Sequence, residues 1–288
     1  MADASTQTLL FWNIHEKPIY ESVVRLCHSH GVDFLLLAES NLNGARLLEA
    51  LNQGDSRYWP IFAQPNDLAV FARHPPLSAV RTIKIPRLDP LDRIQPSDSN
   101  VLFFRIRIGP HPFNLVLVHL RSQLRGKPID WGEGIRNVNS RIRLFEKTKV
   151  KDDRTIVVGD FNMNPFDEGL VAASGFHAMM TRDLATERGR FVDRLPHPFF
   201  YNPMWSRFGC EKTTGRPPGT FFYDKAEFVR YYWNLFDQVL VRPSMLGHFA
   251  DEDLEVIQHD GHSPLRMNGR PNSESFSDHL PILFKLRF

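Results

Sequence analysis

Short apolar runs alternate with polar, turn-forming segments along most of the chain. Residues 9–14 form the first run, and after Pro18 the segment 19–30 has apolar side chains at near-helical spacing. Residues 33–38 are apolar without alternation, as in a strand that is covered on both faces. We therefore predict a strand, a helix and a second strand, with Glu39 at the C-terminal end of the second strand.

Later segments repeat this strand-rich pattern with few helices. The apolar runs predict strands over 68–71, 101–108, 113–119, 155–158, 235–241 and 280–286, and residues 137–149 predict an amphipathic helix. Gly109-Pro110-His111-Pro112 joins two of these strands as a hairpin, so antiparallel pairing is expected. The pattern lacks strict strand and helix alternation, which favours two packed sheets flanked by helices over a doubly wound parallel sheet.

Two long stretches show no steady periodicity. Residues 182–233 are dense in aromatic residues and prolines, and we interpret them as an elaborated rim of the molecule. Residues 260–277 are polar and rich in Gly, Pro, Asn and Ser, which predicts a surface loop. Neither stretch contains an internal repeat.

The composition is that of an ordinary globular protein, with 42% hydrophobic and 24% charged residues in a chain of 288. Polar residues interrupt every apolar run, so no membrane span is expected. The chain shows no secretion signal, and we interpret Cys27 and Cys210 as reduced thiols in a cytoplasmic protein. A net charge of +2 is too small to indicate nucleic acid by itself.

Polar residues stand at the ends of several predicted strands. They are Asn13, Glu39, Asp160 and Asn162. Each alone could be an ordinary turn residue or strand-end cap. Together they suit a hard cation such as Mg²⁺, which takes one or two carboxylates together with water and phosphate oxygens.

Asp237 is a carboxylate inside the apolar run 235–240. An unpaired charge would be costly there, so Asp237 should have a partner. Asp278-His279 comes directly before the last predicted strand, and His279 is our candidate.

Six short sequence blocks, in their order along the chain, resemble the pattern of one protein family. They are Trp12-Asn13-Ile14, Ala38-Glu39-Ser40, Val118-His119-Leu120, Gly159-Asp160-Phe161-Asn162, Phe236-Asp237-Gln238-Val239-Leu240 and Ser277-Asp278-His279. The chain resembles the endonuclease/exonuclease/phosphatase superfamily, which includes relatives of deoxyribonuclease I, exonuclease III, sphingomyelinases and inositol polyphosphate phosphatases. The resemblance implies one α/β (α+β) domain over 1–288, a four-layered sandwich with two mostly antiparallel sheets packed face to face.

The resemblance also implies roles for the residues in these blocks. Glu39 would bind Mg²⁺ or Mn²⁺ with Asn13 beside it and Asp278 in the same metal shell. Asp160 would orient or deprotonate the attacking water, and Asn162 would hold the nucleophile and the phosphate. His279, kept cationic by Asp237, would stabilise charge on the phosphate oxygens. His119 matches a second histidine that assists the leaving oxygen.

His15 departs from part of the family pattern. Some nuclease branches have an acidic residue two places after the first asparagine, where this chain has His15. The difference argues against close kinship with the apurinic-site enzymes and favours one metal over two.

The substrate is less sharply defined than the reaction. Arg121 and Arg125 follow His119 and could contact a phosphate backbone, whereas the basic residues of the predicted helix are expected at its surface. Aromatic residues within 205–233 could stack on bases, pack in the core or form an apolar rim for a lipid headgroup. We favour a nuclease acting on DNA or RNA; the alternatives are a small-molecule or phospholipid phosphoesterase and an inactive interaction module.

Overall fold

The computed structural model describes residues 6–54, 56–64, 67–75, 80–83, 99–108, 111–120, 128–209, 215–225 and 231–288. The chain divides into two compact units that interleave along the sequence. The first unit comprises residues 1–80, 207–237 and 248–288, and the second unit comprises residues 81–206 and 238–247. The single domain expected over 1–288 stays a prediction.

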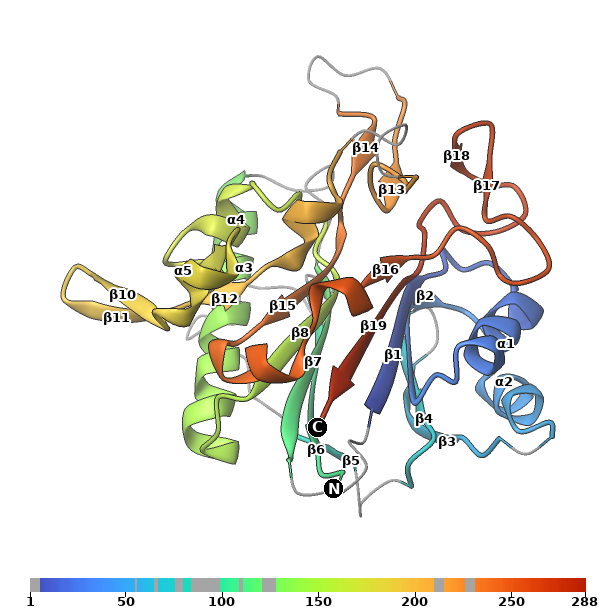
Figure 1. The fold of residues 1–288 in the computed structure, drawn as a ribbon, viewed down its shortest axis with the longest axis horizontal. Helices are drawn as coiled ribbons and strands as arrows, with labels where there is room; N and C mark the ends of the chain where they lie inside the picture. Colours follow the sequence, from blue (N-terminus) through green and yellow to red (C-terminus); the bar gives the residue numbers. More distant parts are fainter. Residues whose placement is uncertain are drawn as a thin grey trace. The chain divides into compact units, whose positions relative to one another are not determined.

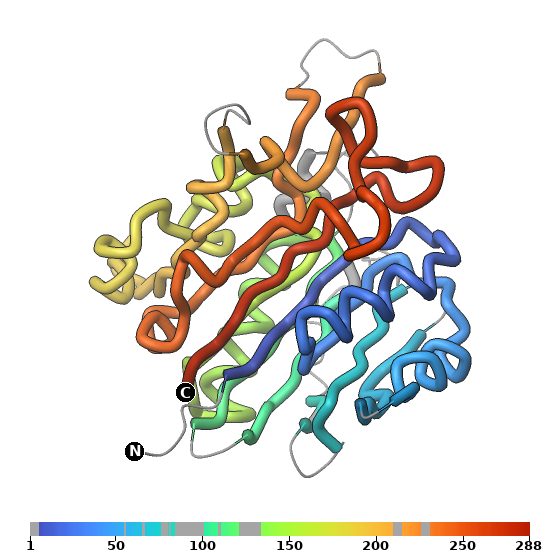
Figure 2. Tube along the Cα trace, turned by 45° about the vertical axis from the view of Figure 1, so that its right-hand side comes forward, coloured from blue at the N-terminus to red at the C-terminus, as the bar shows by residue number. Residues whose placement is uncertain are grey.

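The first unit is built on a six-stranded sheet in the order β16-β19-β1-β2-β4-β3. Its strands are β1 (Thr6–Asn13), β2 (Phe34–Ser40), β3 (Trp59–Ala63), β4 (Asp67–Ala72), β16 (Glu255–Val256) and β19 (Ile282–Arg287). β1 runs parallel to β2 and antiparallel to β19, so the first and last long strands of the chain lie side by side, as Figure 2 shows. β16 and β19, β2 and β4, and β3 and β4 pair antiparallel.

Two helices cover one face of this sheet in Figure 1, α1 (Tyr20–Ser29) and α2 (Gly44–Leu51). α1 buries Val23 and Leu26, the residues whose spacing predicted it. α2 was not predicted, because it has only 8 residues. Its start is fixed by Asn43, whose side chain accepts a hydrogen bond from the backbone of Arg46 at 3.0 Å.

The second unit is built on a seven-stranded sheet in the order β5-β6-β7-β8-β15-β12-β9. Its strands are β5 (Val80–Thr82), β6 (Ser99–Ile106), β7 (Phe113–Leu120), β8 (Thr155–Asp160), β9 (Ala178–Met179), β12 (Phe200–Tyr201) and β15 (Asp237–Val241). β6 and β7 form the predicted antiparallel pair, whereas β7 and β8 are parallel. Helix α3 (Pro128–Leu144) continues as the π-helix η2 (Phe145–Val150), and its Val138 and Ile142 pack in a core with Val116 and Val157 of the sheet.

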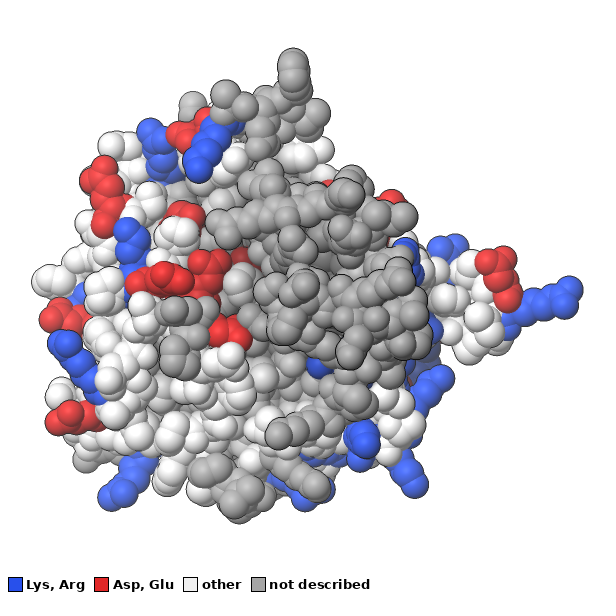
Figure 3. All heavy atoms as spheres, turned by 180° about the vertical axis from the view of Figure 1, so that it is seen from behind, with Lys and Arg blue, Asp and Glu red and all other residues white. Residues whose placement is uncertain are grey.

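Short elements complete both units. They are α4 (Glu168–Val171), α5 (Arg182–Thr186), β10 (Gly189–Val192), β11 (Leu195–Pro198), η3 (Pro203–Arg207), β13 (Phe221–Phe222), β14 (Trp233–Asn234), η4 (Pro243–His248), η5 (Asp251–Asp253), β17 (Arg266–Met267) and β18 (Arg270–Pro271). The β10–β11 hairpin extends away from the rest of the second unit in Figure 1 and carries acidic and basic side chains in Figure 3.

Most predicted strands are confirmed, with end points that differ by a few residues. Two predictions need correction. The helix expected over 137–149 begins at Pro128, and the segment 260–277 holds the small β17–β18 hairpin within its loop. Among the described residues, none of the helices has the length and apolarity to span a membrane. Cys210 lies outside the described residues, and the cytoplasmic location stays a prediction.

Candidate active site

The predicted site residues fall into two groups, one in each unit. The first unit holds Asn13, Glu39, Asp237, Asp278 and His279, and the second unit holds His119, Asp160 and Asn162.

Glu39 lies at an irregularity near the end of β2. The register between β2 and β4 shifts between Leu37 and Ser40, and Glu39 has a φ of 47°. A bulge of this kind turns a side chain away from the regular pleat and is common beside active sites. The buried Asn13 at the end of β1 donates its side-chain amide to Glu39 Oε1 at 3.1 Å. Asn13 therefore orients the Glu39 carboxylate.

His15 lies against both predicted carboxylate ligands. Its Nδ1 is 3.3 Å from Glu39 Oε2 and 3.7 Å from Asp278 Oδ1. The hydrogen bond to Glu39 raises the pKa of His15; partial burial opposes this, and the charge of Asp278 adds to it. The Glu39 and Asp278 carboxylates thus both lie close to the His15 ring.

The predicted contact between Asp237 and His279 is confirmed. His279 Nδ1 is 2.8 Å from Asp237 Oδ2, and the two residues are 6% and 0% exposed. Within the described part of the chain, the other oxygen of Asp237 has no hydrogen-bond partner. A buried carboxylate with one histidine partner fixes the ring's orientation and favours the imidazolium form.

Residues outside the predicted site hold this pair in place. Thr220 Oγ1 accepts from the backbone of Asp237 at 3.1 Å, and the Phe221 ring lies 4.5 Å from the His279 ring. The backbone of His279 donates to Ser277 Oγ at 3.0 Å, and its carbonyl accepts from the Trp12 indole at 2.9 Å. Nothing in the sequence alone marks Thr220, because its contact with Asp237 joins residues that are 17 positions apart.

In the second unit, His119 and Asp160 are neighbours on parallel strands. They stand opposite each other in the register of β7 and β8. Gly159 precedes Asp160 with a φ of 149°, and a Cβ there would lie 1.8 Å from the carbonyl oxygen of Val118. Only glycine fits this approach, so the geometry of the strand end requires glycine at position 159.

The turn after Asp160 is held by hydrogen bonds at both ends. Asp160 Oδ1 accepts from the backbone of Asn162 at 2.7 Å, and the Asn162 side chain donates to the Leu120 carbonyl at 2.8 Å. Asn162 has a φ of 50°, a conformation that asparagine tolerates better than most residues. Gln238 donates to the Met163 carbonyl at 2.6 Å and so anchors the residue after the turn.

Arg121 and Arg125 are the predicted phosphate contacts, and both lie among the residues that the structure does not describe. Of the helical arginines expected at the surface, Arg141 is only 9% exposed, and its guanidinium lies 5.3 Å from the centre of the Phe103 ring. That expectation is wrong for Arg141, because its long side chain covers the aromatic core.

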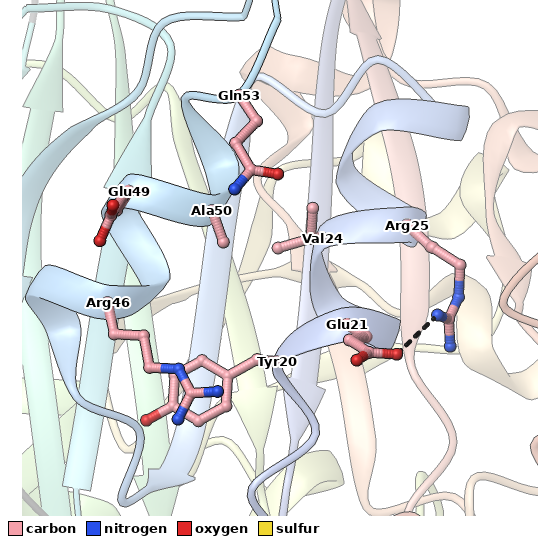
Figure 4. A pocket seen from close by; sticks show the side chains of 8 residues that line it. All are labelled: Tyr20, Glu21, Val24, Arg25, Arg46, Glu49, Ala50 and Gln53. Carbon is pink, nitrogen blue, oxygen red and sulfur yellow. Dashed lines mark hydrogen bonds and ion pairs between the residues drawn. The ribbon is translucent and has the colours of Figure 1, made fainter.

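The first unit has a pocket of about 520 Å³, and Figure 4 shows the side chains that line it. Helices α1 and α2, with Gln53 just after α2, supply its lining, which consists of Tyr20, Glu21, Val24, Arg25, Arg46, Glu49, Ala50 and Gln53. Acidic and basic side chains alternate there, and Arg25 pairs with Glu21 at 3.4 Å. None of the predicted site residues lines this pocket, so it is not the candidate active site.

The donor set of the first unit fits a divalent cation. Glu39 and Asp278 bring oxygens to one nitrogen of His15, and the buried Asn13 amide braces Glu39. Carboxylates at a solvent-accessible position suit a hard cation that also keeps water ligands.

A family model and several solved structures match the chain. The model of the Endonuclease/Exonuclease/phosphatase family matches residues 10–279. Zebrafish (D. rerio) TDP2 complexed with single-stranded DNA product has a TM-score of 0.53 and 14% identity, over 98% of this chain and 99% of that chain. A variant of the 3′ phosphatase NExo from Neisseria, bound to product DNA hairpin, has a TM-score of 0.56 and 15% identity, over 98% and 100%.

A family protein from Bacteroides thetaiotaomicron has a TM-score of 0.55 and 14% identity, over 99% of both chains. No curated protein sequence matches the chain. The structural likenesses confirm the expected fold class, the deoxyribonuclease I-like α/β sandwich with mostly antiparallel sheets and flanking helices.

Proposed function

Because the chain belongs to the endonuclease/exonuclease/phosphatase family, whose members are metal-dependent hydrolases of phosphoester bonds, we propose that it hydrolyses phosphodiester bonds of nucleic acid. The observation that carries the proposal is the buried Asp237–His279 contact, 2.8 Å long. A fixed, positively charged histidine stabilises the negative charge that builds on phosphate oxygens during hydrolysis.

Glu39 and Asp278 would hold the cation, Mg²⁺ or Mn²⁺, with Asn13 orienting Glu39. The cation would offset the charge of the phosphate and of the leaving oxygen. The bulge at Glu39 supports this role, since it sets the carboxylate apart from the pleat of β2. Asn13 would act by keeping one Glu39 oxygen in a fixed direction through the 3.1 Å hydrogen bond.

Asp160 would orient the attacking water and accept its proton. Its carboxylate lies at the end of β8. Asn162 fixes the turn that follows, because its backbone amide donates to Asp160 and its side chain donates to the Leu120 carbonyl. Asn162 would hold the water and a phosphate oxygen with its amide group. His119, opposite Asp160 in the register of β7 and β8, would donate a proton near the leaving oxygen.

A group of aromatic residues in the first unit supports nucleic acid over a small phosphate ester. The aromatic ledge consists of Phe222, Tyr223, Tyr231, Tyr232 and Trp233. Tyr231 and Tyr232 are 56% and 50% exposed, which is high for such large rings. Aromatic faces of this kind stack on unpaired bases without sequence preference.

Basic side chains are interleaved with the ledge. The Arg270 guanidinium lies 5.5 Å from the centre of the Phe222 ring, and that of Arg266 lies 5.5 Å from the Trp233 ring. Such cations could contact the backbone of the same strand. The titles of the TDP2 and NExo structures name bound DNA products, which adds support for this substrate class.

A substrate panel tests the proposal. The full chain would be incubated with single-stranded and duplex DNA, RNA, an inositol phosphate and a phospholipid, with Mg²⁺ or Mn²⁺. We expect cleavage of single-stranded DNA or RNA, a loss of at least about 100-fold in His279→Ala, and no loss in His262→Ala, an exposed histidine of the same unit. Preference for the lipid or the small ester would refute the substrate class, and metal-independent or absent hydrolysis would refute the reaction.

A further inference from the structure

Four basic side chains gather where helix α3 meets the β10–β11 hairpin of the second unit (Figure 1). They are Arg143 of α3, His177, Arg190 of β10 and His197 of β11. Arg190 Nε donates to His177 Nε2 at 3.0 Å, and Arg143 Nη2 lies 3.4 Å from His197 Nδ1. None of the proposed catalytic roles uses these residues.

We propose that this basic group of Arg143, His177, Arg190 and His197 is a binding site for a phosphate group. The phosphate is either an inorganic ion or part of a nucleic-acid strand. The site goes beyond the proposed function, because it includes none of the predicted active-site residues.

Arg143 reaches this group without finding an acceptor. Its contact with His197 is between two donors, because His197 Nδ1 also lies 2.6 Å from the Ala173 carbonyl, which can only accept a hydrogen bond. The Arg143 Nε is buried and has no hydrogen-bond partner among the described residues. A buried donor without an acceptor is costly, so the chain alone satisfies this guanidinium group poorly.

Arg242 shows how a buried arginine is satisfied in the same unit. Its Nε and Nη2 donate to the two carboxylate oxygens of Glu146 at 2.9 and 3.0 Å, and its Nη1 donates to the Phe199 carbonyl at 3.0 Å. Glu146 lies three residues after Arg143, but its oxygens are engaged by Arg242. The missing acceptor at Arg143 is therefore a local feature of the basic group.

Arg190 also has donors to spare. Its Nε is held by the fully buried His177, whose Nδ1 donates to the His197 carbonyl at 3.1 Å. Within the part of the chain that the structure describes, no carboxylate pairs with Arg190, whereas Arg188 pairs with Asp153 at 3.6 Å. Because Arg190 is exposed, its two terminal nitrogens are open to a ligand from solvent.

The charge around the basic group is unbalanced. Arg242 neutralises Glu146, which leaves the charges of Arg143 and Arg190 without a described counter-charge. Burial and the charge of Arg242 lower the pKa of Arg143, and burial and the charge of Arg190 lower the pKa of His177. Both pKa values move in the direction expected where negative charge is lacking.

A phosphate group supplies what the basic group lacks. It carries nearly two negative charges at neutral pH as a monoester or free ion, and its oxygens are strong acceptors. Planar guanidinium groups bind such oxygens through paired, charge-assisted hydrogen bonds. Since Arg143 and Arg190 come from different elements, they can contact different oxygens of one tetrahedral anion.

Histidine-ring NMR of the full chain at pH 7 in EDTA tests the site, with inorganic phosphate added at constant ionic strength. We expect the signals of His177 and His197, assigned through His177→Asn and His197→Asn, to shift and saturate. Arg143→Gln and Arg190→Gln should each weaken phosphate affinity by about tenfold or more, since each removes a charge-assisted hydrogen bond. The control Arg188→Gln, whose arginine already has an acidic partner, should match the parent.

A single-stranded oligonucleotide without terminal phosphates, titrated in EDTA, distinguishes the two sources. Shifts of the same signals with the oligonucleotide identify a strand-binding site, and shifts with phosphate alone identify a small-anion site. Thermal melting would check the folding of each variant; because Arg190 also holds His177, Arg143→Gln decides if Arg190→Gln is unstable. No saturable shift with either ligand, or equal affinity in Arg143→Gln and Arg188→Gln, would overturn the proposal and leave the proposed hydrolysis standing.

Discussion

Asp237 is a fully buried carboxylate whose described contacts include one charged partner, His279. Its second oxygen has no hydrogen-bond partner among the described residues, so the side chain is poorly satisfied as a purely structural group. This arrangement is better explained by a role of His279 in the reaction than by a contribution of Asp237 to the stability of the fold. Asp237 would act on His279 in two ways: its negative charge would favour the charged ring, and its hydrogen bond would hold the ring in one orientation.

Asp237→Asn tests the contact, because it keeps the shape and removes the charge. We expect the rate of phosphodiester cleavage to fall by about 100-fold or more, since His279 loses the anion that favours its charged form. Single-turnover rates at neutral pH would measure this. The matched control is Asp253→Asn, which breaks the 2.6 Å ion pair with Arg287. Equal activity in the two variants would remove Asp237 from the mechanism.

Sequence could predict this pair but not the residues that support it. An isolated charge in an apolar run demands a partner, and this argument led to His279. Thr220 carries no such signal. Its role depends on its contact with Asp237, which only the fold brings within reach.

At the scale of elements, the β10–β11 hairpin is attached to the second unit through a buried histidine. His177 is fully buried, accepts a hydrogen bond from Arg190 Nε at 3.0 Å and lies 3.1 Å from the His197 carbonyl. Burial and the nearby Arg190 charge lower the pKa of His177 to about 4. The hydrogen bond from Arg190 to His177, which anchors the hairpin, therefore requires a neutral His177 ring.

This anchor should make the protein less stable in mild acid. Between pH 6.5 and 4 the unfolded histidine binds a proton that the folded one does not, so stability present at pH 7 is lost as pH falls. From pH 7 to pH 5 the loss attributable to His177 should be about 1 to 2 kcal/mol. Urea unfolding at both pH values would measure it. His177→Asn should lack this part of the pH dependence, whereas His30→Asn should retain it; identical pH dependence in His177→Asn and the parent would contradict the account.

The long strands were predictable, while the rim around residues 182–233 was not. Strands such as β7 and β8 are buried on both faces and appear as apolar runs of normal length. β12, β13 and β14 have two residues each, which is too short for any period. Their positions follow from partners such as β15, so sequence alone showed only that this stretch is irregular.

At the scale of the whole molecule, the proposed residues come from two units that interleave along the chain. Glu39 and His279 belong to the first unit, and Asp160 and Asn162 belong to the second. Both groups of residues fall within the six sequence blocks that follow the family's order, and the family match spans residues 10–279. If both groups serve one reaction, loss of either should remove nearly all of its rate.

The most direct test is single-turnover cleavage of a labelled single-stranded oligonucleotide by the parent, Glu39→Gln, Asp160→Asn and the double variant, each with Mn²⁺ and with EDTA. The account predicts no cleavage in EDTA and a loss of about 1,000-fold or more in each single variant. The double variant should be within about tenfold of the weaker single variant. The exposed-site controls Glu49→Gln and Asp183→Asn should match the parent. Cleavage that persists in EDTA, or losses that multiply in the double variant, would contradict it.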